Sequence, residues 1–585
     1  MKSIPIDRFC SELIIEELIR CGVRYFCIAP GSRSTPLTLA VAHHSQTKSY
    51  THFDERGLAF FSLGQAKALE NPVVIMTTSG TAVANLLPAV IEAYQSFIPL
   101  ILLTADRPPE LHNSGANQTI GQSQIFGKFI RWSCQLSCSD PPVPPQSILT
   151  TIDQLVYRAT QTPAGPVHMN CMFREPFFQK KDPFSLHGKK SSLTQWKRSK
   201  QPYTTYSPSL PALDQSQIKS ISLRLNQIKE GLLVVGELYN EQAIGSLKKL
   251  SEHLGWPLFP DVLSPLRWDR SGSNSPIIFM IDQILNSHDF SKKLKPEGIL
   301  YFGGPLVSKQ LQTYMKTASF FIQVNSHPDR QDPLHAVSHR VQSEIHKFCS
   351  DLLPHLNPHS INPWTRQWLK FNSQIFQTLS TLIKKTKALN EAKICWTLSS
   401  LIPPDHILFL GNSLPIREMG LYGQPGIKNI LIYGNRGASG IDGLIATATG
   451  IQHGLNKPLT LLLGDLSLLH DLNSLALLRQ AKKPFVIIVL NNNGGGIFSF
   501  LPIAQDQNRQ NTFEKFFVMP HNLNFSQAAA LFGLSYYASH SIAEFTRHYQ
   551  KALNDPSPSL IEVETDRKGN VLFQKHIDQE LSRIT

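Results

Sequence analysis

Two polar turns in the last third of the chain combine residue types that bind a hard cation. Asp465 follows the apolar run Leu459–Leu463, and Asn492 follows a second apolar run, Phe485–Leu490. Runs this short and rich in branched residues are typical of buried strands rather than helices. Leucines recur at helical spacing between the two runs, which predicts a strand–helix–strand unit with parallel strands. Both turns should therefore lie at the sheet edge where open α/β sheets bind ligands.

The ligand that these turns predict is a magnesium ion bound to a diphosphate. One carboxylate, one side-chain amide and the carbonyls of the NNNGGG turn offer oxygen atoms, which Mg²⁺ prefers in a shell shared with phosphate. A helix that begins after Asp465 would add the positive end of its dipole. A Gly-Asp turn alone is often structural, so the combination of two turns separated by one helix and one strand makes the pattern specific.

The bulk composition predicts a soluble protein with several domains. The 585 residues exceed what one core can organise, so three or four domains are expected. No apolar run approaches the roughly 18 residues of a membrane helix, and the start of the chain lacks the apolar region of a signal peptide. The eight cysteines are scattered, as in reduced proteins, which favours a cytoplasmic location.

The formal charge of +13 is a weak indicator of function. Lys and Arg residues are spread along the chain, apart from a basic stretch at Lys180–Lys200 that is typical of a solvated linker. No helix-turn-helix, RNP or zinc-finger pattern is found, and the Rossmann and P-loop glycine fingerprints are absent. We therefore expect small-molecule partners, with no nucleic acid and no membrane span.

Three α/β blocks are predicted, each a mostly parallel sheet flanked by helices. Their boundaries are expected at residues 1–180 for the first domain, 181–212 for a linker, 213–356 for the central domain and 357–585 for the last domain. The predicted strands of the first two blocks are Tyr25–Ala29, Val73–Thr77, Leu100–Thr104, Pro166–Asn170, Gly231–Val235, Ile299–Phe302 and Phe320–Val324.

Two features of the first block have both a structural and a functional interpretation. Glu55 stands at the start of a predicted helix, where an acid often only compensates the helix dipole. The segment Thr78–Ser79–Gly80 follows a predicted strand and opens a helix, which is also the composition of a plain N-cap.

The Gly-Asp and Asn-Asn turns together resemble the motif of thiamin diphosphate-dependent enzymes, and the chain departs from it at Leu466, where glycine is more frequent. The resemblance implies a three-domain fold in which the first domain binds the pyrimidine ring and the last binds the diphosphate. It also implies that Glu55 shares a proton with the pyrimidine ring. The cofactor-binding residues implied are Glu55, Thr78, Ser79, Gly80, Ile441, Gly464, Asp465, Leu466, Ser467, Asn492 and Gly494, of which Asp465, Asn492 and Gly494 would bind Mg²⁺, with Mn²⁺ as an alternative.

Further motifs resemble one branch of this family, the 2-succinyl-5-enolpyruvyl-6-hydroxy-3-cyclohexene-1-carboxylate synthases. The resemblance is specific in both outer blocks and thin across the central one. It implies decarboxylation of 2-oxoglutarate and addition of the succinyl carbanion to isochorismate in menaquinone biosynthesis, by a homodimer or homotetramer. The motifs are APGSRSTPL (29–37), TADRPPEL (104–111), GANQTI (115–120), GNSLPIRE (411–418), GNRGASGIDG (434–443) and NNNGGGIF (491–498).

The resemblance agrees with the chemistry of the arginine residues. Both expected substrates are dianions, and an arginine fork binds a carboxylate through two hydrogen bonds. By resemblance, Ser32, Arg33, Arg107 and Gln118 face isochorismate and the reacting centre, and Ser32, Arg33, Gln118 and Glu55 form the catalytic set. The remaining substrate residues implied are Lys309, Ser413, Arg417, Arg436, Ile497 and Phe498, and Ile441 would support the bent cofactor.

Two departures and two alternatives remain open at this stage. Gln310, next to Lys309, stands where a second basic residue is frequent, and Gly496 stands where a larger polar residue is common. One alternative is another thiamin diphosphate-dependent decarboxylase or carboligase, such as an acetolactate synthase. The decarboxylases' paired histidines are not found after the Thr78–Gly80 turn, and His43–His44 is expected to be a surface pair. The other alternative is a catalytically inactive relative that serves as a scaffold.

Overall fold

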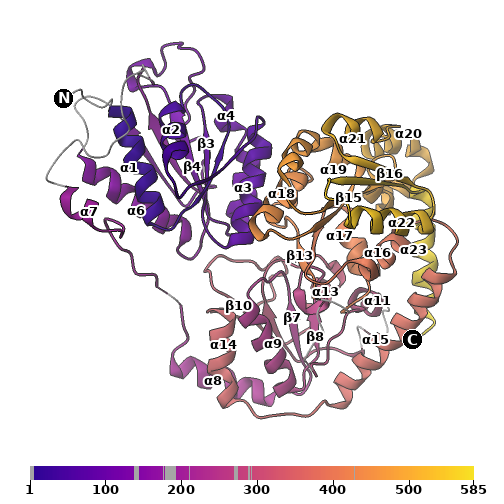
Figure 1. Ribbon diagram of the computed structural model, residues 1–585. Coiled ribbons are helices and arrows are strands. Elements are labelled where there is room, and N and C mark those ends of the chain that lie inside the picture. Colours follow the sequence, from indigo (N-terminus) through magenta and orange to yellow (C-terminus); the bar gives the residue numbers. More distant parts are fainter. Residues whose placement is uncertain are drawn as a thin grey trace. The chain divides into compact units, whose positions relative to one another are not determined.

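The computed structural model describes most of the chain and divides it into two compact units (Figure 1). The first unit contains Met1–Ser209, Asn435–Asn456 and His470–Lys482. The second contains Leu210–Gly434, Lys457–Leu469 and Lys483–Thr585. The residues described are 6–137, 144–175, 177, 193–209, 211–268, 274–286, 290, 293–426 and 429–584.

Six parallel strands form the sheet of the first unit, in the order β2-β1-β3-β4-β6-β5. The four predicted strands are confirmed as β1, β3, β4 and β6. Sequence patterns missed β2 and β5 because both are edge strands with several exposed or half-exposed residues. The strands are β1 (Tyr25–Ile28), β2 (Lys48–Thr51), β3 (Val73–Thr77), β4 (Leu100–Asp106), β5 (Trp132–Ser137) and β6 (Val167–Met172).

Helices cover both faces of this sheet and bury a separate apolar core on each side. Helices α1, α2 and α6 contribute to one core, and α3 and α5 contribute to the other. The helices of the block are α1 (Ile6–Arg20), α2 (Thr35–His43), α3 (Glu55–Leu69), α4 (Thr81–Ala84), α5 (Leu87–Gln95), η1 (Pro109–Leu111), α6 (Pro145–Thr160) and α7 (Thr194–Arg198).

The central block is a five-stranded parallel sheet in the order β11-β10-β9-β7-β8. The three strands predicted here are confirmed as β7, β9 and β10. The strands are β7 (Gly231–Val235), β8 (Leu258–Pro260), β9 (Gly298–Phe302), β10 (Phe320–Asn325) and β11 (His339–Gln342). The helices are α8 (Gln215–Gln227), α9 (Glu241–Leu254), α10 (Pro265–Trp268), α11 (Ile281–Leu285), α13 (Lys309–Met315), α14 (Ile345–Leu352) and η4 (Leu353–His355). Helix α15 (Pro363–Lys385) follows, beyond the predicted boundary at residue 356.

The last block contains a six-stranded parallel sheet in the order β13-β12-β14-β15-β17-β16. Counted from its own first strand, this order equals that of the first sheet, so the two outer blocks share one topology. Each block is a parallel sheet with flanking helices, which confirms the predicted fold class. The strands are β12 (Ile407–Leu410), β13 (Leu431–Tyr433), β14 (Leu459–Gly464), β15 (Phe485–Asn491), β16 (Ser535–Ser539) and β17 (Ser559–Glu564).

The last block contains both short and long helices. They are α16 (Glu391–Leu401), α17 (Leu414–Tyr422), α18 (Leu444–Leu455), α19 (Asp465–His470), η5 (Leu472–Gln480), η6 (Gly496–Phe500), η7 (Pro502–Gln505), η8 (Gln507–Arg509), α20 (Gln510–Phe513), η9 (Glu514–Val518), α21 (Ser526–Phe532), α22 (Ile542–Leu553) and α23 (Arg567–Ser582).

Helix α18 belongs to the first unit because it packs directly on α3 (Figure 1). A Cβ atom added at Gly64 would lie 2.0 Å from the carbonyl oxygen of Thr447. A Cβ atom added at Gly450 would lie 2.0 Å from the carbonyl oxygen of Phe61. The two helix backbones are therefore in contact, and a side chain at either glycine would push them apart.

The prediction of a single helix after Asp465 is wrong, because the helix is interrupted at Asp471. Helix α19 ends at His470, and the leucine-rich stretch beyond it forms the 3₁₀ helix η5. The Asp471 carboxylate accepts the N–H groups of Ile445 (2.8 Å) and Ala446 (3.1 Å) and so caps the start of α18. Its other oxygen accepts the Ser474 hydroxyl at 2.7 Å. Because Asp471 makes these bonds to α18, helix α19 ends before it and does not continue into the leucine-rich stretch.

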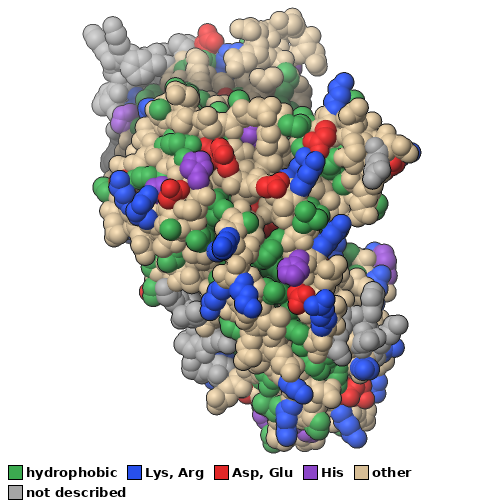
Figure 2. Space-filling model, turned by 90° about the vertical axis from the view of Figure 1, so that its right-hand side faces the viewer, with side chains coloured by type: hydrophobic (Ala, Val, Ile, Leu, Met, Phe, Trp, Pro, Cys, Tyr) green, Lys and Arg blue, Asp and Glu red, His purple; other side chains and the backbone are tan. Residues whose placement is uncertain are grey.

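Basic side chains are dispersed over the face of the molecule in Figure 2, among polar and apolar ones. Of the basic stretch at Lys180–Lys200, residues 180–192 lie outside the described part of the chain, whereas Lys197 and Lys200 are described. Among the described helices, none combines the length and the apolar character needed to cross a bilayer.

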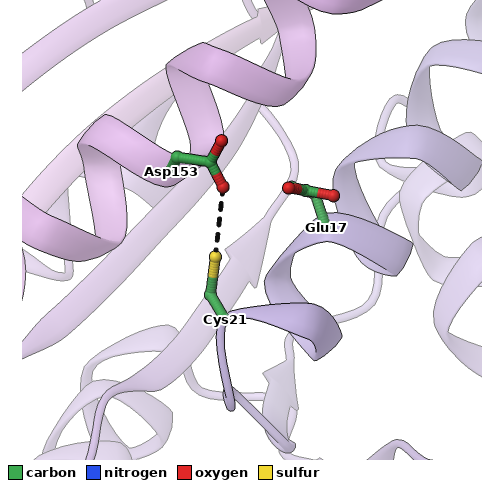
Figure 3. Close-up of side chains that lie close together, drawn as sticks. All are labelled: Glu17, Cys21 and Asp153. Atoms are coloured by element: carbon green, nitrogen blue, oxygen red, sulfur yellow. Dashed lines mark hydrogen bonds between the residues drawn. The ribbon is translucent and has the colours of Figure 1, made fainter. Parts of the chain in front are cut away.

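Part of the predicted linker is docked on the first block. Figure 3 shows Glu17, Cys21 and Asp153 pointing toward one another from α1, the turn after it and α6. Glu17 accepts the Trp196 indole N–H at 2.7 Å, and Asp153 accepts the Thr204 N–H at 2.7 Å. Burial, reinforced by the neighbouring Asp153, raises the pKa of Glu17 to about 8. The carboxylates thus hold the chain that leaves the first block.

The contact between α3 and α18 predicts the effect of one added methyl group. Gly64→Ala should destabilise the first unit by about 1–3 kcal/mol, because backbone atoms cannot yield to the new Cβ. Calorimetry should show the melting transition of this unit several degrees lower. The matched control is Gly245→Ala in α9, where nothing lies within 4 Å of the added Cβ and no loss is expected. Equal transitions in both variants would contradict the close packing.

Candidate functional site

The first unit gathers predicted site residues where its strand order reverses. The chain passes from β1 outward to β2 and then returns to β3 on the other side of β1, so a crevice opens beyond β1 and β3. The loop after β1 contains Ser32 and Arg33, and the turn after β3 contains Thr78. A Cβ atom added at Gly31 would lie 2.3 Å from the Cβ of Thr78, so the two loops are in contact.

Two largely buried arginine residues, Arg33 and Arg107, are neighbours at this edge of the sheet. Their exposed fractions are 7% and 9%. Burial and the charge of Arg107 lower the pKa of Arg33, so the two guanidinium groups repel each other. Arg33 donates to the Phe173 carbonyl (3.1 Å) and pairs with the exposed Glu175 (3.0 Å). Such a pair of cations favours an anionic ligand.

The loop after β4 joins the turn after β3 through hydrogen bonds. Arg107 donates through Nη1 to the Ser79 hydroxyl, and the Gln118 amide donates to the Ser79 carbonyl at 3.1 Å. Gln122, which sequence reasoning missed, accepts the Gly80 N–H at 3.2 Å and donates to Asn170 at 2.7 Å. The structure therefore brings Ser79, Gly80, Arg107 and Gln118 together.

Glu55 is the first residue of α3 and is half-buried. The capping role belongs to its neighbour, because the Asp54 carboxylate accepts the N–H groups of Arg56 (3.0 Å) and Gly57 (3.3 Å). Asp54 also accepts the Asn473 amide at 3.2 Å. The cap is therefore supplied by Asp54, while Glu55 lies in the first turn of the helix, where it also compensates the helix dipole. Ser32 and Gln118 are exposed.

Arg436 and Ile441 also belong to the first unit. Glu92 on α5, a second residue that sequence reasoning missed, accepts the N–H groups of Gly437 (2.7 Å) and Ala438 (2.6 Å). These bonds hold the loop that carries Arg436. Ile441 is half-buried just before α18.

The second unit contains the two polar turns, at Asp465 and Asn492, for which the sequence predicts a metal site. Asp465 is 2% exposed, and its oxygens accept the N–H groups of Leu466 (2.7 Å) and Gly494 (2.8 Å). The second bond joins the turn after β14 to the turn after β15. Gly494 has φ +127°, and a Cβ atom there would lie 2.2 Å from the Val518 carbonyl oxygen, so glycine is required.

His521 is a further neighbour of Asp465 that sequence reasoning missed. Its Nε2 lies 3.1 Å from Asp465 Oδ2, and its Nδ1 accepts the Leu523 N–H at 3.0 Å. Because Nδ1 is the acceptor, Nε2 carries the proton and donates to the carboxylate. Gly464 and Leu466 flank Asp465, and Ser467 is buried in α19.

Asn492 is held through only one end of its amide. Its Nδ2 donates to the buried Glu391 at 2.9 Å, whereas its Oδ1 is buried and has no donor among the residues that the structure describes. Burial raises the pKa of Glu391, and burial with the nearby Glu391 raises that of Glu418 well above its usual range. The raised pKa values of these two neighbouring carboxyl groups favour a proton on at least one of them.

These residues fit a hard cation. Asp465 offers a carboxylate. Among the residues that the structure describes, the amide oxygen of Asn492 has no donor and the Gly494 carbonyl accepts only the Gly496 N–H, at 2.9 Å. A buried amide oxygen without a donor is costly unless a ligand binds it. The donor set consists of oxygen atoms alone, as Mg²⁺ and Mn²⁺ prefer.

A cavity of about 470 Å³ in the second unit brings together Lys309, Gln310 and Arg417. Ser413, at the start of α17, accepts from Arg417 through its carbonyl oxygen. The cavity wall also contains Asp282, which is half-buried and whose pKa desolvation raises to about 6. Ile497 is half-buried, and Phe498 is exposed and packs edge-on against Phe517 at 5.8 Å.

Models of three enzyme domains match the chain in order. They are described as thiamine pyrophosphate enzyme, N-terminal TPP binding domain (residues 9–125), middle domain of thiamine pyrophosphate (187–410) and thiamine pyrophosphate enzyme, C-terminal TPP binding domain (428–563).

Curated relatives match over nearly the whole length. The 2-succinyl-5-enolpyruvyl-6-hydroxy-3-cyclohexene-1-carboxylate synthase of Rubrobacter xylanophilus is 42% identical and covers 98% of each chain. Its counterpart in Salinibacter ruber is 39% identical over 98% of this chain and 96% of the relative. Among solved structures, benzoylformate decarboxylase from Polynucleobacter necessarius has a TM-score of 0.72 over 95% of this chain and 98% of that chain. At 17% identity it shares the fold alone.

The raised pKa of Asp282 predicts a pH-dependent stability. Its pKa is raised from 3.8 to about 6, so the folded state binds the proton more tightly than the unfolded state. The stability that this proton supplies is present below the unfolded value and is lost as the pH rises toward 6. Asp282→Asn should therefore raise the free energy of unfolding at pH 8 by about 1–3 kcal/mol and have little effect near pH 4. Melting temperatures measured at both pH values test this. A difference independent of pH would contradict the raised pKa.

Proposed function

The chain belongs to the thiamin diphosphate-dependent 2-succinyl-5-enolpyruvyl-6-hydroxy-3-cyclohexene-1-carboxylate synthases, and we propose that it joins 2-oxoglutarate to isochorismate with loss of CO₂. The product would be the compound for which the family is named, an intermediate of menaquinone biosynthesis. The observation that carries this proposal is the pair of turns at Asp465 and Asn492, on a chain that matches these synthases over 98% of its length.

We propose that Asp465, Asn492 and the Gly494 carbonyl bind Mg²⁺, or Mn²⁺ in its place, which in turn holds the diphosphate. Thiamin diphosphate, when bound, supplies the carbon nucleophile and accepts the electron pair released with CO₂. The chain's own contribution is to fix the cation through residues that are themselves held by hydrogen bonds. Three N–H groups orient Asp465, and Glu391 accepts from Asn492. The remaining contacts proposed are with Thr78, Ser79, Gly80, Ile441, Gly464, Leu466 and Ser467.

The proposed role of Glu55 is to share a proton with the pyrimidine ring. The half-buried position of Glu55 and the assignment of the helix cap to Asp54 support this role. Shielding from water disfavours the charged form of a carboxyl group and so favours a shared proton.

We propose that Arg33 and Arg107, the two neighbouring buried arginines described above, bind carboxylates of isochorismate. Arg33 and Arg107 are both over 90% buried and repel each other, so a bound anion would relieve an electrostatic cost already present. Ser32 and Gln118, both exposed, are proposed to contact the reacting groups.

For the 2-oxoglutarate-derived part, the proposed contacts are with Ser413, Arg417, Arg436 and Lys309. The cavity shared by Lys309 and Arg417 supports this assignment, and the exposed Gln310 adds no charge to it. Ile497 and Phe498 are proposed to line the apolar side of isochorismate.

We propose a homodimer or homotetramer in the cytoplasm. By resemblance to the family, the cofactor would take Glu55 from one subunit and Asp465 from another. In the described part of the chain the cysteines are free, which is consistent with a reducing compartment. The domain boundaries at residues 180, 212 and 356 stay predictions.

The central experiment supplies the purified chain with thiamin diphosphate, Mg²⁺, 2-oxoglutarate and isochorismate. Isochorismate should disappear in step with CO₂ release. Consumption of 2-oxoglutarate alone would indicate a simple decarboxylase, and turnover of pyruvate alone would indicate an acetolactate synthase. Cofactor binding without any turnover would indicate an inactive relative.

Removal of the Glu55 carboxylate should abolish most of the turnover. Glu55→Gln should lower kcat by about 100-fold or more, because the amide cannot share the proton. Asp54→Asn is the matched control, since it removes one negative charge at the adjacent position and retains a capping side chain. Steady-state kinetics measure both variants. Full turnover by Glu55→Gln, or an equal loss in both variants, would refute the proposed role.

Replacing the Arg33 guanidinium group by an ammonium group should raise KM for one substrate selectively. Arg33→Lys should raise KM for isochorismate by about 10-fold or more, because a lysine cannot form the paired hydrogen bonds. KM for 2-oxoglutarate should change little. Arg174→Lys is the control, because Arg174 is an exposed arginine of the same unit, paired with Glu110 at 2.6 Å. A parallel rise for both substrates would argue against the assignment to isochorismate.

A further inference from the structure

The amide of Asn492 has two ends that meet different surroundings. Nδ2 donates to Glu391 Oε1 at 2.9 Å, and Oδ1 is buried without a donor among the described residues. The two ends of an asparagine amide have nearly the same shape, so hydrogen bonds rather than packing decide which one faces a given direction. If the amide were reversed, its oxygen would face the Glu391 carboxylate, and the hydrogen bond would be lost.

Glu391 is itself fixed in place. It is fully buried at the start of α16, where the Asn390 side chain caps the helix. The Thr565 hydroxyl donates to the same Oε1 atom at 3.0 Å, and the Glu391 N–H donates to Asn570 at 3.2 Å. Oε1 is therefore presented to Asn492 only as an acceptor, by a side chain that has no freedom to move away.

The two side-chain ligands of the proposed cation site need different kinds of support. The carboxylate of Asp465 has two equivalent oxygens, so either orientation offers an oxygen, and donors such as His521 are enough to hold it. The Asn492 amide offers an oxygen in only one of its two orientations. Only an acceptor behind Nδ2 selects that orientation, and Glu391 supplies it.

We propose that Glu391 is the positioning residue that keeps the Asn492 oxygen directed toward the cation of the active site. The inference rests on the proposed function, because it requires that Asn492 bind a metal ion. Partners of this kind behind a ligand typically change metal affinity by about 10- to 100-fold. Glu391 does not touch the cation in this role and acts only through Asn492.

The test measures metal affinity rather than turnover. Mn²⁺ is titrated into the full-length protein at saturating thiamin diphosphate, and free Mn²⁺ is followed by electron paramagnetic resonance. Glu391→Met has a similar volume but no acceptor. Glu391→Gln keeps an acceptor oxygen for Asn492 and can donate to Glu418. Thermal melting of the same proteins without metal and cofactor reports stability separately.

The inference predicts a separation between the variants. Glu391→Met should weaken Mn²⁺ binding by about 10-fold or more, whereas Glu391→Gln should stay within about threefold of the wild type. Glu418→Gln is the matched control, because it alters the other member of the buried carboxyl pair and leaves the bond between Glu391 and Asn492 in place. Its Mn²⁺ affinity should equal that of the wild type.

Each of the following results would overturn the inference. Wild-type Mn²⁺ affinity in Glu391→Met would show that Asn492 does not need its acceptor. Equal losses in Glu391→Met and Glu391→Gln, or in Glu418→Gln, would indicate a general structural effect. If Glu391→Met fails to fold, an affinity of Glu391→Gln weakened more than threefold would overturn it. Failure of the wild type itself to bind Mn²⁺ with the cofactor would refute the metal site of the proposed function, and this inference with it.

Discussion

The structure of the site depends on one constraint, the parallel pairing of β14 with β15. Parallel strands end at the same sheet edge, and the register that pairs Gly464 with Leu490 sets the two following turns side by side. The bond from the Gly494 N–H to the Asp465 carboxylate then joins the turns at 2.8 Å. Every residue of β15 is buried, so a shift of one residue would exchange the side chains on its two packed faces and separate these groups. Core packing and ligand geometry are therefore fixed together.

The two outer sheets share one strand order but carry different chemistry at the carboxyl ends of their strands. In the first unit, the loops after β1, β3 and β4 present guanidinium and hydroxyl groups around Arg33 and Arg107. In the second, the turns after β14 and β15 present oxygen atoms. The scaffold provides a crevice in both cases, and the loop residues decide whether it favours anions or cations.

The sequence was sufficient for much of the fold and for the ligand turns. Buried strands such as β3, β14 and β15 are recognisable in the sequence as apolar runs. Asp465 directly follows β14, and Asn492 directly follows β15. The edge strands were missed because their exposed residues break that signal. Glu391 could not be found, because it lies 101 residues from Asn492 and resembles an ordinary acid at a helix start. The helix break at Asp471 depends on its contact with α18, a tertiary interaction that leaves no periodic pattern.

The seam of glycines between α3 and α18 has a consequence for dissecting the protein. The first unit is assembled from three separate stretches of sequence, and α18 supplies the surface against which Gly64 lies. A clone that stops at Ser209 would keep every strand of the first sheet and lose the helix that packs on α3. Apolar and backbone groups of α3 would then meet solvent, so fragments of the gene are poor substitutes for the intact polypeptide.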